Sequence, residues 1–130
     1  MKKLLFAALT VVFALSLFSF IAAEKKPWVV PPKYTAMKIQ KKGDPASISL
    51  GKTLYTKYCK SCHGAGKGDG AKASSLKTKM EDLTAPAFKS IPDGNKYYMS
   101  FVGRDEMPNF EKKIADEEER WAIINYMNSL

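Results

Sequence analysis

The sequence predicts a small all-α domain that follows an N-terminal export segment and a polar connector. Apolar residues recur at helical spacing before one short cysteine motif and again at the C-terminus, whereas no useful stretch alternates like a strand. The chain has 130 residues, enough for one domain and not two. A helical domain of about 85 residues has a thin core of its own, so a large apolar cofactor would add to its stability.

Residues 1–23 are predicted to be a signal peptide or an N-terminal membrane anchor. Lys2 and Lys3 form a basic start, and an apolar stretch follows from Leu4 to Ala23. This pattern is typical of an export signal. The stretch of 20 residues is also just long enough to span a bilayer. Both alternatives place the remaining chain outside the cytoplasm, so we expect a periplasmic protein, either free or anchored to the inner membrane through residues 4–23.

Residues 24–46 are predicted to be a Pro/Lys-rich tether. They contain Pro27, Pro31, Pro32 and six lysines, with no clear apolar period. Such a composition favours an extended connector. Two alternatives remain open at this point, a disordered arm and a segment that folds back onto the domain through Trp28.

Residues 47–130 are expected to form the folded domain, with three recognisable helices. The first begins at Asp44-Pro45, where aspartate suits the N-cap and proline suits the first helical position. The second covers residues 95–102 and ends at Gly103. The third begins near Asp116, with Glu119 three residues later as in a capping box. The apolar residues of the first and third helices are Ile48, Leu50, Leu54, Tyr55, Tyr58, Trp121, Ala122, Ile123, Ile124, Tyr126, Met127 and Leu130.

The chemistry is concentrated in the pentapeptide from Cys59 to His63. It holds both cysteines and the single histidine of the chain. Two thiols three positions apart can each form a thioether with a haem vinyl group, and the histidine that follows can ligate the iron. Three such residues are too few for a structural zinc site. A thioredoxin-type pair would need a strand–helix–strand context that is not predicted, and a plain disulfide between Cys59 and Cys62 remains the other alternative.

Met107 is the best candidate among the six methionines for the second axial ligand. It precedes Pro108, which pushes the preceding residue out of helical geometry, and it lies 44 positions after His63. That length of chain is enough to reach the opposite face of a haem, and a thioether is a common axial ligand. Met80 and Met99 are the alternatives, although Met99 and Met127 fit the helical pattern of core residues.

From Ser47 to Leu130 the chain resembles class I cytochrome c, and most of all its bacterial periplasmic monohaem forms. The resemblance implies a cytochrome c fold, with three to five helices packed around one covalently attached haem c. It further implies that the terminal helices cross at Gly51 and that His63 and Met107 are the axial ligands. Family members often have proline where this chain has Ala71, at a position whose carbonyl accepts a hydrogen bond from the histidine ligand. The matching residues are Gly51, Tyr55, Cys59, Cys62, His63, Gly64, Gly66, Lys67, Gly68, Asp69, Gly70, Asp82, Leu83, Thr84, Gly103, Met107, Pro108, Phe110, Trp121 and Tyr126.

These residues predict an electron carrier and not an enzyme. An iron with both axial positions filled offers no open site to a substrate, yet it can change oxidation state. The expected partners are redox proteins. One alternative is a membrane-anchored or tightly bound cytochrome subunit of an oxidase or reductase complex. Another is a haem protein that binds small gases or acts as a weak peroxidase.

The charge is unevenly distributed along the chain. The net charge is +8, and residues 25–96 hold 15 lysines against five acidic groups. A basic half favours an acidic redox partner, although an ordinary solvated face has the same composition. Nucleic acid is not an expected partner, because an exported chain would not meet it.

Overall fold

The structure, a computed structural model, describes residues 26–130, so the predicted export segment lies outside the described residues. The all-α prediction is confirmed, because residues 26–130 contain helices and turns but no strand. Within this part of the chain every helix is too short or too polar to cross a membrane. The elements are α2 (Pro32–Thr35), α3 (Pro45–Tyr58), α4 (Lys60–His63), the 3₁₀ turn η1 (Ala73–Ser75), α5 (Pro86–Lys89), α6 (Asp93–Tyr97), the π-helical turn η2 (Tyr98–Val102) and α7 (Glu117–Ser129).

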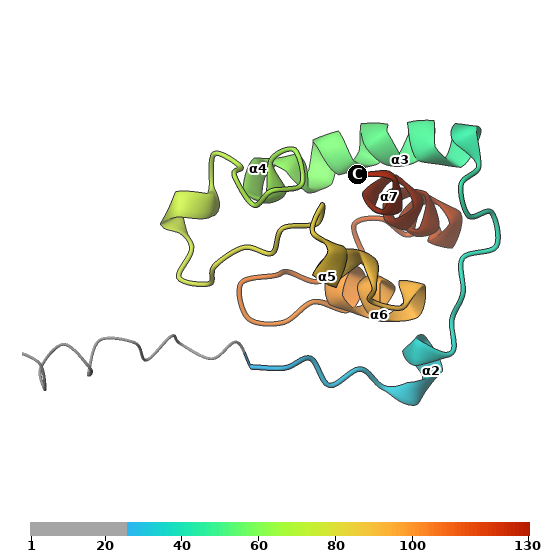
Figure 1. Ribbon diagram of the computed structural model, residues 1–130, viewed down its shortest axis with the longest axis horizontal. Coiled ribbons are helices and arrows are strands. Elements are labelled where there is room, and N and C mark those ends of the chain that lie inside the picture. Colours follow the sequence, from blue (N-terminus) through green and yellow to red (C-terminus); the bar gives the residue numbers. More distant parts are fainter. Residues whose placement is uncertain (1–25) are drawn as a thin grey trace, which may run out of the picture.

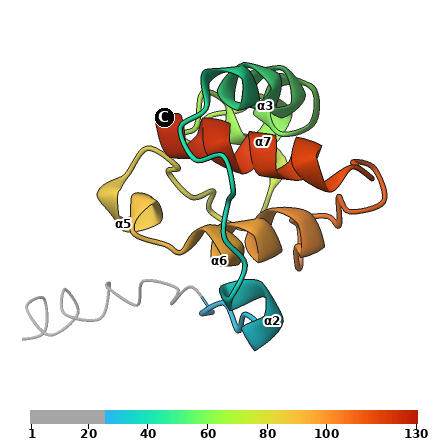
Figure 2. The same ribbon diagram turned by 90° about the vertical axis from the view of Figure 1, so that its right-hand side faces the viewer.

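The helices are stacked in layers. Figures 1 and 2 show α3 at one side of the stack, α7 crossing beneath it, α6 in the next layer, and α2 at the far side. The core lies between these layers, and its largest fully buried side chains come from α3, η2, α7 and the loop before α7. They are Tyr55, Phe101, Ile114, Ile123, Ile124 and Asn125.

The first predicted helix is confirmed as α3. The Asp44 carboxylate accepts a hydrogen bond from the Ser47 amide at 2.7 Å, and Pro45 is the first helical residue. Leu54 and Tyr55 are buried, but Leu50 is 44% exposed, which the apolar pattern did not predict. The buried face is centred on Gly51, and a residue one position away is rotated by about 100° around the helix.

Gly51 is the point where α3 and α7 touch. A Cβ atom at this position would lie 1.9 Å from the carbonyl oxygen of Ala122 and 2.9 Å from the Cβ of Tyr126. Only glycine permits this approach, because any side chain would overlap the α7 backbone. The crossing implied by the resemblance is therefore present. The contact involves the backbone of α7 as well as its aromatic residue, and Tyr126 packs edge-on against Tyr55 at 5.2 Å between ring centroids.

The predicted C-terminal helix is confirmed as α7, with one difference at its start. The Asp116 carboxylate caps the helix by accepting from the amide of Glu118, at 2.7 Å, and not from that of Glu119. The helix is well buried, as expected. Its buried residues are Ala122, Ile123, Ile124, Asn125 and Met127.

The remaining predicted helix is present as α6 together with η2. It begins two residues earlier than expected, at Asp93, and ends at Gly103, whose φ of 69° stops the helix. Met99, in η2, is only half-buried, so its assignment to the core was wrong, whereas Met127 is 5% exposed and belongs to the core. Tyr97 and Phe101 fill the core side of this segment instead of Met99.

Residues 26–43, here called the N-terminal strap, fold back along α6 and then past α7 (Figures 1 and 2). The ring of Tyr34 packs against those of Tyr97 and Tyr98, and Met37 contacts the core. Of the two alternatives left open, the segment that folds back is the one seen, because its aromatic and apolar side chains find partners. The disordered arm is wrong for residues 26–43, while the domain boundary at 46/47 stays a prediction.

The far end of the strap is fixed to α7 by one buried side chain. Asn125, 1% exposed, accepts a hydrogen bond from the amide of Gly43 at 2.8 Å and donates one to the carbonyl of Lys41 at 2.7 Å. A buried side-chain amide needs such partners, so this pair of bonds fixes where the strap meets α7.

Candidate functional site

The five residues of the cysteine motif form a single helical turn. The carbonyl of Cys59, at the end of α3, accepts hydrogen bonds from the amides of Cys62, at 3.1 Å, and His63, at 3.0 Å. Gly64 then ends the turn with a φ of 58°. These bonds are local, which is why a short pattern of sequence is enough to define the turn.

The glycine-rich stretch after the motif is folded onto it. The carbonyl of His63 accepts from the amides of Gly66, at 3.0 Å, and Gly68, at 3.1 Å. The amide of Gly70 donates to the carbonyl of Cys62 at 3.2 Å. The stretch is thus an ordered turn held by backbone hydrogen bonds, and not a flexible solvent-exposed loop.

Ala71 does not supply the hydrogen bond that the resemblance implies. The Nδ1 atom of His63 is buried and has no partner among the described residues. The segment around Ala71 is nevertheless held close, because the next amide, that of Lys72, donates to the carbonyl of Ser61 at 2.9 Å.

Burial sets the protonation of the motif. It lowers the pKa of His63, which favours the neutral imidazole that can ligate a metal. Burial, followed by the nearby charge of Cys62, raises the pKa of the Cys59 thiol to about 12. Both cysteines are free thiols, so the disulfide alternative is not realised in this structure.

These residues fit a covalently attached haem c. His63 follows Cys62 directly, and burial favours its neutral imidazole, which can ligate a metal. Two free thiols one turn apart are the groups that thioether bonds require. Within residues 26–130 no three His, Cys, Asp or Glu side chains gather as they would around a bound metal ion such as zinc.

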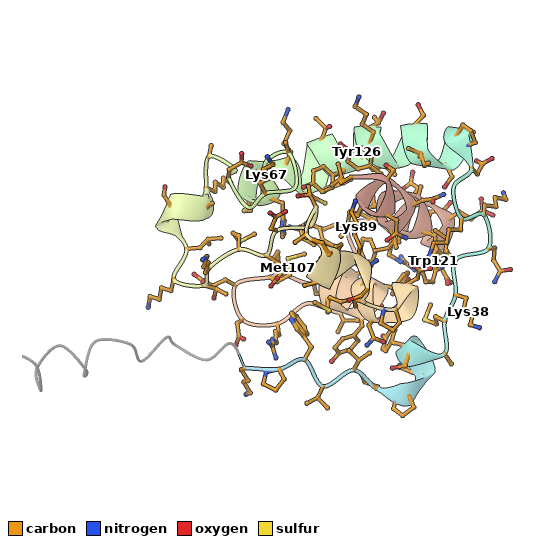
Figure 3. All side chains as sticks on the ribbon, viewed as in Figure 1. Lys38, Lys67, Lys89, Met107, Trp121 and Tyr126 are labelled. Atoms are coloured by element: carbon orange, nitrogen blue, oxygen red, sulfur yellow. The ribbon has the colours of Figure 1, made fainter. Side chains whose placement is uncertain are left out.

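Met107 lies in the loop from Gly103 to Phe110, here called the Met107 loop, at the same end of the molecule as Lys67 and the turn that follows α4 (Figure 3). The ring of Tyr58, the residue before Cys59, packs against the ring of Phe110 at 6.3 Å. The structure therefore brings the start of the motif and the end of this loop together.

Residues 76–83 form a third segment, which contacts both the Met107 loop and the turn that carries His63. The Glu106 carboxylate accepts hydrogen bonds from the amides of Lys77, at 3.0 Å, and Thr78, at 2.7 Å. A few residues later, the amide of Leu83 donates to the carbonyl of Gly66 at 2.6 Å. Residues 76–83 thus connect the Met107 loop to the turn that carries His63.

Of the two alternative methionines, Met80 lies in the connecting segment 76–83 and Met99 lies in η2. Met80 sits against Gly68, where a glycine Cβ would meet its Cβ at 2.6 Å. Met99 lies within the helical turn η2 and not in a loop. Met107 lies in an irregular loop, where a bond from its amide to the carbonyl of Arg104 at 2.9 Å holds its backbone.

The surface at this end of the molecule is basic. Six lysines of α3, α4 and the following segment are exposed, and their charges are available to a partner. They are Lys57, Lys60, Lys67, Lys72, Lys77 and Lys79.

Sequence reasoning missed Arg104 and Glu106, which flank Met107 and connect its loop to distant segments. Their partners lie 28 to 78 positions away in the chain. No periodicity or motif marks such contacts in advance.

Comparison with known families agrees with this geometry. The family model described as cytochrome C oxidase, cbb3-type, subunit III matches residues 46–127. A comparison with curated proteins gave no match. The matched residues include the Cys-x-x-Cys pair and the Met107 loop, and they make up more than half of the chain. The chain belongs to this family, and its folded part is a monohaem c-type cytochrome domain of class I, which implies an electron-transfer haem protein.

Proposed function

We propose that this protein carries single electrons through one haem c that is attached to Cys59 and Cys62 and ligated by His63 and Met107. The observation that carries the proposal is the turn 59–63, on which two free thiols stand next to an imidazole that burial keeps in its neutral, metal-ligating form. The neighbouring loop supplies a methionine held in place by backbone contacts.

Each thiol would form its thioether by adding S–H across the C=C bond of a vinyl group. The sulfur bonds to one carbon and the hydrogen to the other, so the addition needs no oxidant. Attachment to two residues on one turn fixes the cofactor at the end of α3, which the crossing at Gly51 holds against α7.

His63 and Met107 fill both axial positions in this proposal. A haem held by these two residues would supply one-electron ferric/ferrous chemistry, and the thioether of Met107 would raise its potential. Neither ligand has to leave for an electron to pass, which suits a carrier and leaves no position for a substrate. The alternative functions, gas binding and weak peroxidase activity, would both require Met107 to dissociate from the iron.

The expected place of work is outside the cytoplasm, in contact with redox proteins. Residues 1–23 supply the export signal, as a cleaved peptide or as an anchor, and the basic end of the molecule favours an acidic partner.

A fixed subunit of an oxidase complex is the second candidate, and the description of the matching family favours it. The two candidates differ in how the native protein fractionates. A carrier dissociates from its partner even in a gentle purification. A fixed subunit instead co-purifies with the complex in detergent, even at high salt.

Attachment is tested on the full chain, produced in a host with haem-attachment machinery. The denatured wild-type polypeptide should keep the mass of one haem, and the double variant Cys59→Ala/Cys62→Ala should lose it. Ser61→Ala, which changes one of the two residues between them, is the matched control and should keep the haem. A wild-type chain without bound haem contradicts the proposal, and the same mass spectrum reports whether residues 1–23 have been removed.

A further inference from the structure

The Met107 loop has no regular secondary structure of its own. A single bridge joins Arg104 and Met107, and Gly103 enters the loop with a φ of 69°. A Cβ at Gly103 would lie 2.2 Å from the carbonyl oxygen of Met107, so the loop closes tightly on its own start. A short irregular segment of this kind depends on contacts from outside to stay in one conformation.

One such contact comes from the N-terminal strap, through Arg104. Its Nη1 atom donates to the carbonyl of Pro27 at 2.8 Å, and its Nη2 atom donates to the carbonyl of Lys26. The guanidinium carbon lies 3.9 Å from the centroid of the Trp28 ring. The planar arginine fork is thus bound at its edge by two carbonyls and at its face by an indole.

Trp28 is itself fixed to the residues that precede the loop. Its ring meets the ring of Tyr98 edge-on at 6.2 Å, and Tyr98 also packs against Tyr34 of the strap at 4.9 Å. The strap therefore holds η2 and Arg104 together, through contacts separate from the Glu106 bonds to residues 77–78.

The position of Arg104 is coupled to that of Met107. The carbonyl of Arg104 accepts the amide of Met107 at 2.9 Å, and the Arg104 side chain is the part of this unit that reaches the strap. If the guanidinium loses its partners, the backbone that carries Met107 loses its support from the strap, while the Glu106 bonds and the contacts of Phe110 remain.

We propose that Arg104 is a positioning residue for Met107, and that Lys26, Pro27 and Trp28 of the strap hold the Met107 loop closed through it. This proposal rests on the role of Met107 as an axial ligand. The strap then controls the rate at which another ligand replaces the thioether of Met107. The segment that composition describes as a tether is part of the redox site.

The test compares Arg104→Ala, Arg104→Lys and Trp28→Ala in the full haem-loaded chain. Arg104→Lys keeps the charge but cannot bind two carbonyls and stack as arginine does. The matched control is Lys112→Ala, an exposed lysine two residues beyond the loop. Two rates are measured, namely the rate at which imidazole replaces the methionine ligand in the ferric protein, and amide hydrogen exchange in residues 104–110. The midpoint of thermal unfolding is recorded for every variant.

Arg104→Ala and Trp28→Ala should both speed imidazole binding roughly tenfold or more, since the first removes the donor of both strap hydrogen bonds and the second removes its aromatic support. Both should also speed exchange in residues 104–110 but not in α7. The rates of Arg104→Lys should lie between those of the wild type and Arg104→Ala, and Lys112→Ala should match the wild type. Wild-type rates in both variants, or faster exchange throughout the chain, would overturn the proposal. A wild-type protein that lacks attached haem or methionine ligation would instead overturn the proposed function, and the exchange measurement still reports the strap's hold on the loop.

Discussion

At the scale of single residues, the assignment of the second axial ligand depends on Met107. Replacing it with alanine removes the thioether, so the weak long-wavelength band of methionine-ligated ferric haem should vanish and the midpoint potential should fall. Met80→Ala and Met99→Ala are the matched controls and should keep both. Absorption spectra and redox titration of the three variants check this. A Met107→Ala protein that retains the band would return the role to Met80 or Met99.

The candidate ligands could be predicted because their chemistry is local. Cys59, Cys62 and His63 share one turn, and Met107 is marked by the proline that follows it. Arg104 could not be predicted, because its partner Pro27 lies 77 positions away and is a backbone carbonyl, which every residue offers. Only the folded chain shows that these two meet.

At the scale of elements, the crossing of α3 and α7 should depend on the missing side chain at Gly51. In an exposed helix interior, alanine stabilises relative to glycine by roughly 0.5–1 kcal/mol. Here the sign should reverse, because the new methyl would overlap the carbonyl of Ala122. Gly51→Ala should therefore lower the free energy of unfolding by about 1–3 kcal/mol, as overpacking does.

Chemical denaturation of the haem-loaded protein measures the effect of Gly51→Ala. Ser49→Ala, at an exposed position of the same helix, is the control and should be neutral or slightly stabilising. If Gly51→Ala proves as stable as Ser49→Ala, then α3 and α7 can separate at this point without cost, and the close approach is not a constraint on the fold.

The helices seen as α3, α6 with η2, and α7 were predictable from sequence, whereas α2, α5 and most side-chain partners were not. The caps at Asp44 and Asp116 and the stop at Gly103 follow from side-chain and backbone preferences of those residues. Lys96 shows the limit of such reasoning. Its side chain is 2% exposed, and its amine donates to the side-chain oxygen of Asn128 at 2.7 Å, inside a segment where a lysine suggests a solvent face. Burial lowers the pKa of this lysine, yet its partner on α7 makes the position tolerable.

At the scale of the whole molecule, the uneven charge should govern how partners approach. The exposed lysines near α4 act over about 8 Å at physiological salt and further at low salt. An acidic partner should therefore exchange electrons faster as ionic strength falls, with the change in the association rate. Lys60→Glu should slow this reaction, whereas Lys38→Glu should affect it little.

The control lysine is chosen from its place in the structure. Figure 3 shows Lys38 at the opposite end of the molecule from Lys67 and Met107, although both lysines carry the same charge. Stopped-flow rates over a series of salt concentrations compare the two variants. Rates that do not depend on salt, or equal slowing by both substitutions, would show that the lysines form only a solvated face.

The two hydrogen bonds between Asn125 and the strap also have a consequence for the order of folding. Its bonds join residues 82 and 84 positions apart, and they need α7, the last helix of the chain, to be in place. Bringing together residues so distant in sequence is slow compared with forming a helical turn. The strap, which is synthesised first among the described residues, is therefore among the last parts to dock. The turn 59–63 needs only neighbouring carbonyls, so it can form while the chain around it is still open. During that interval the two thiols would be accessible to whatever delivers the proposed cofactor, and docking of the strap onto Arg104 would follow attachment.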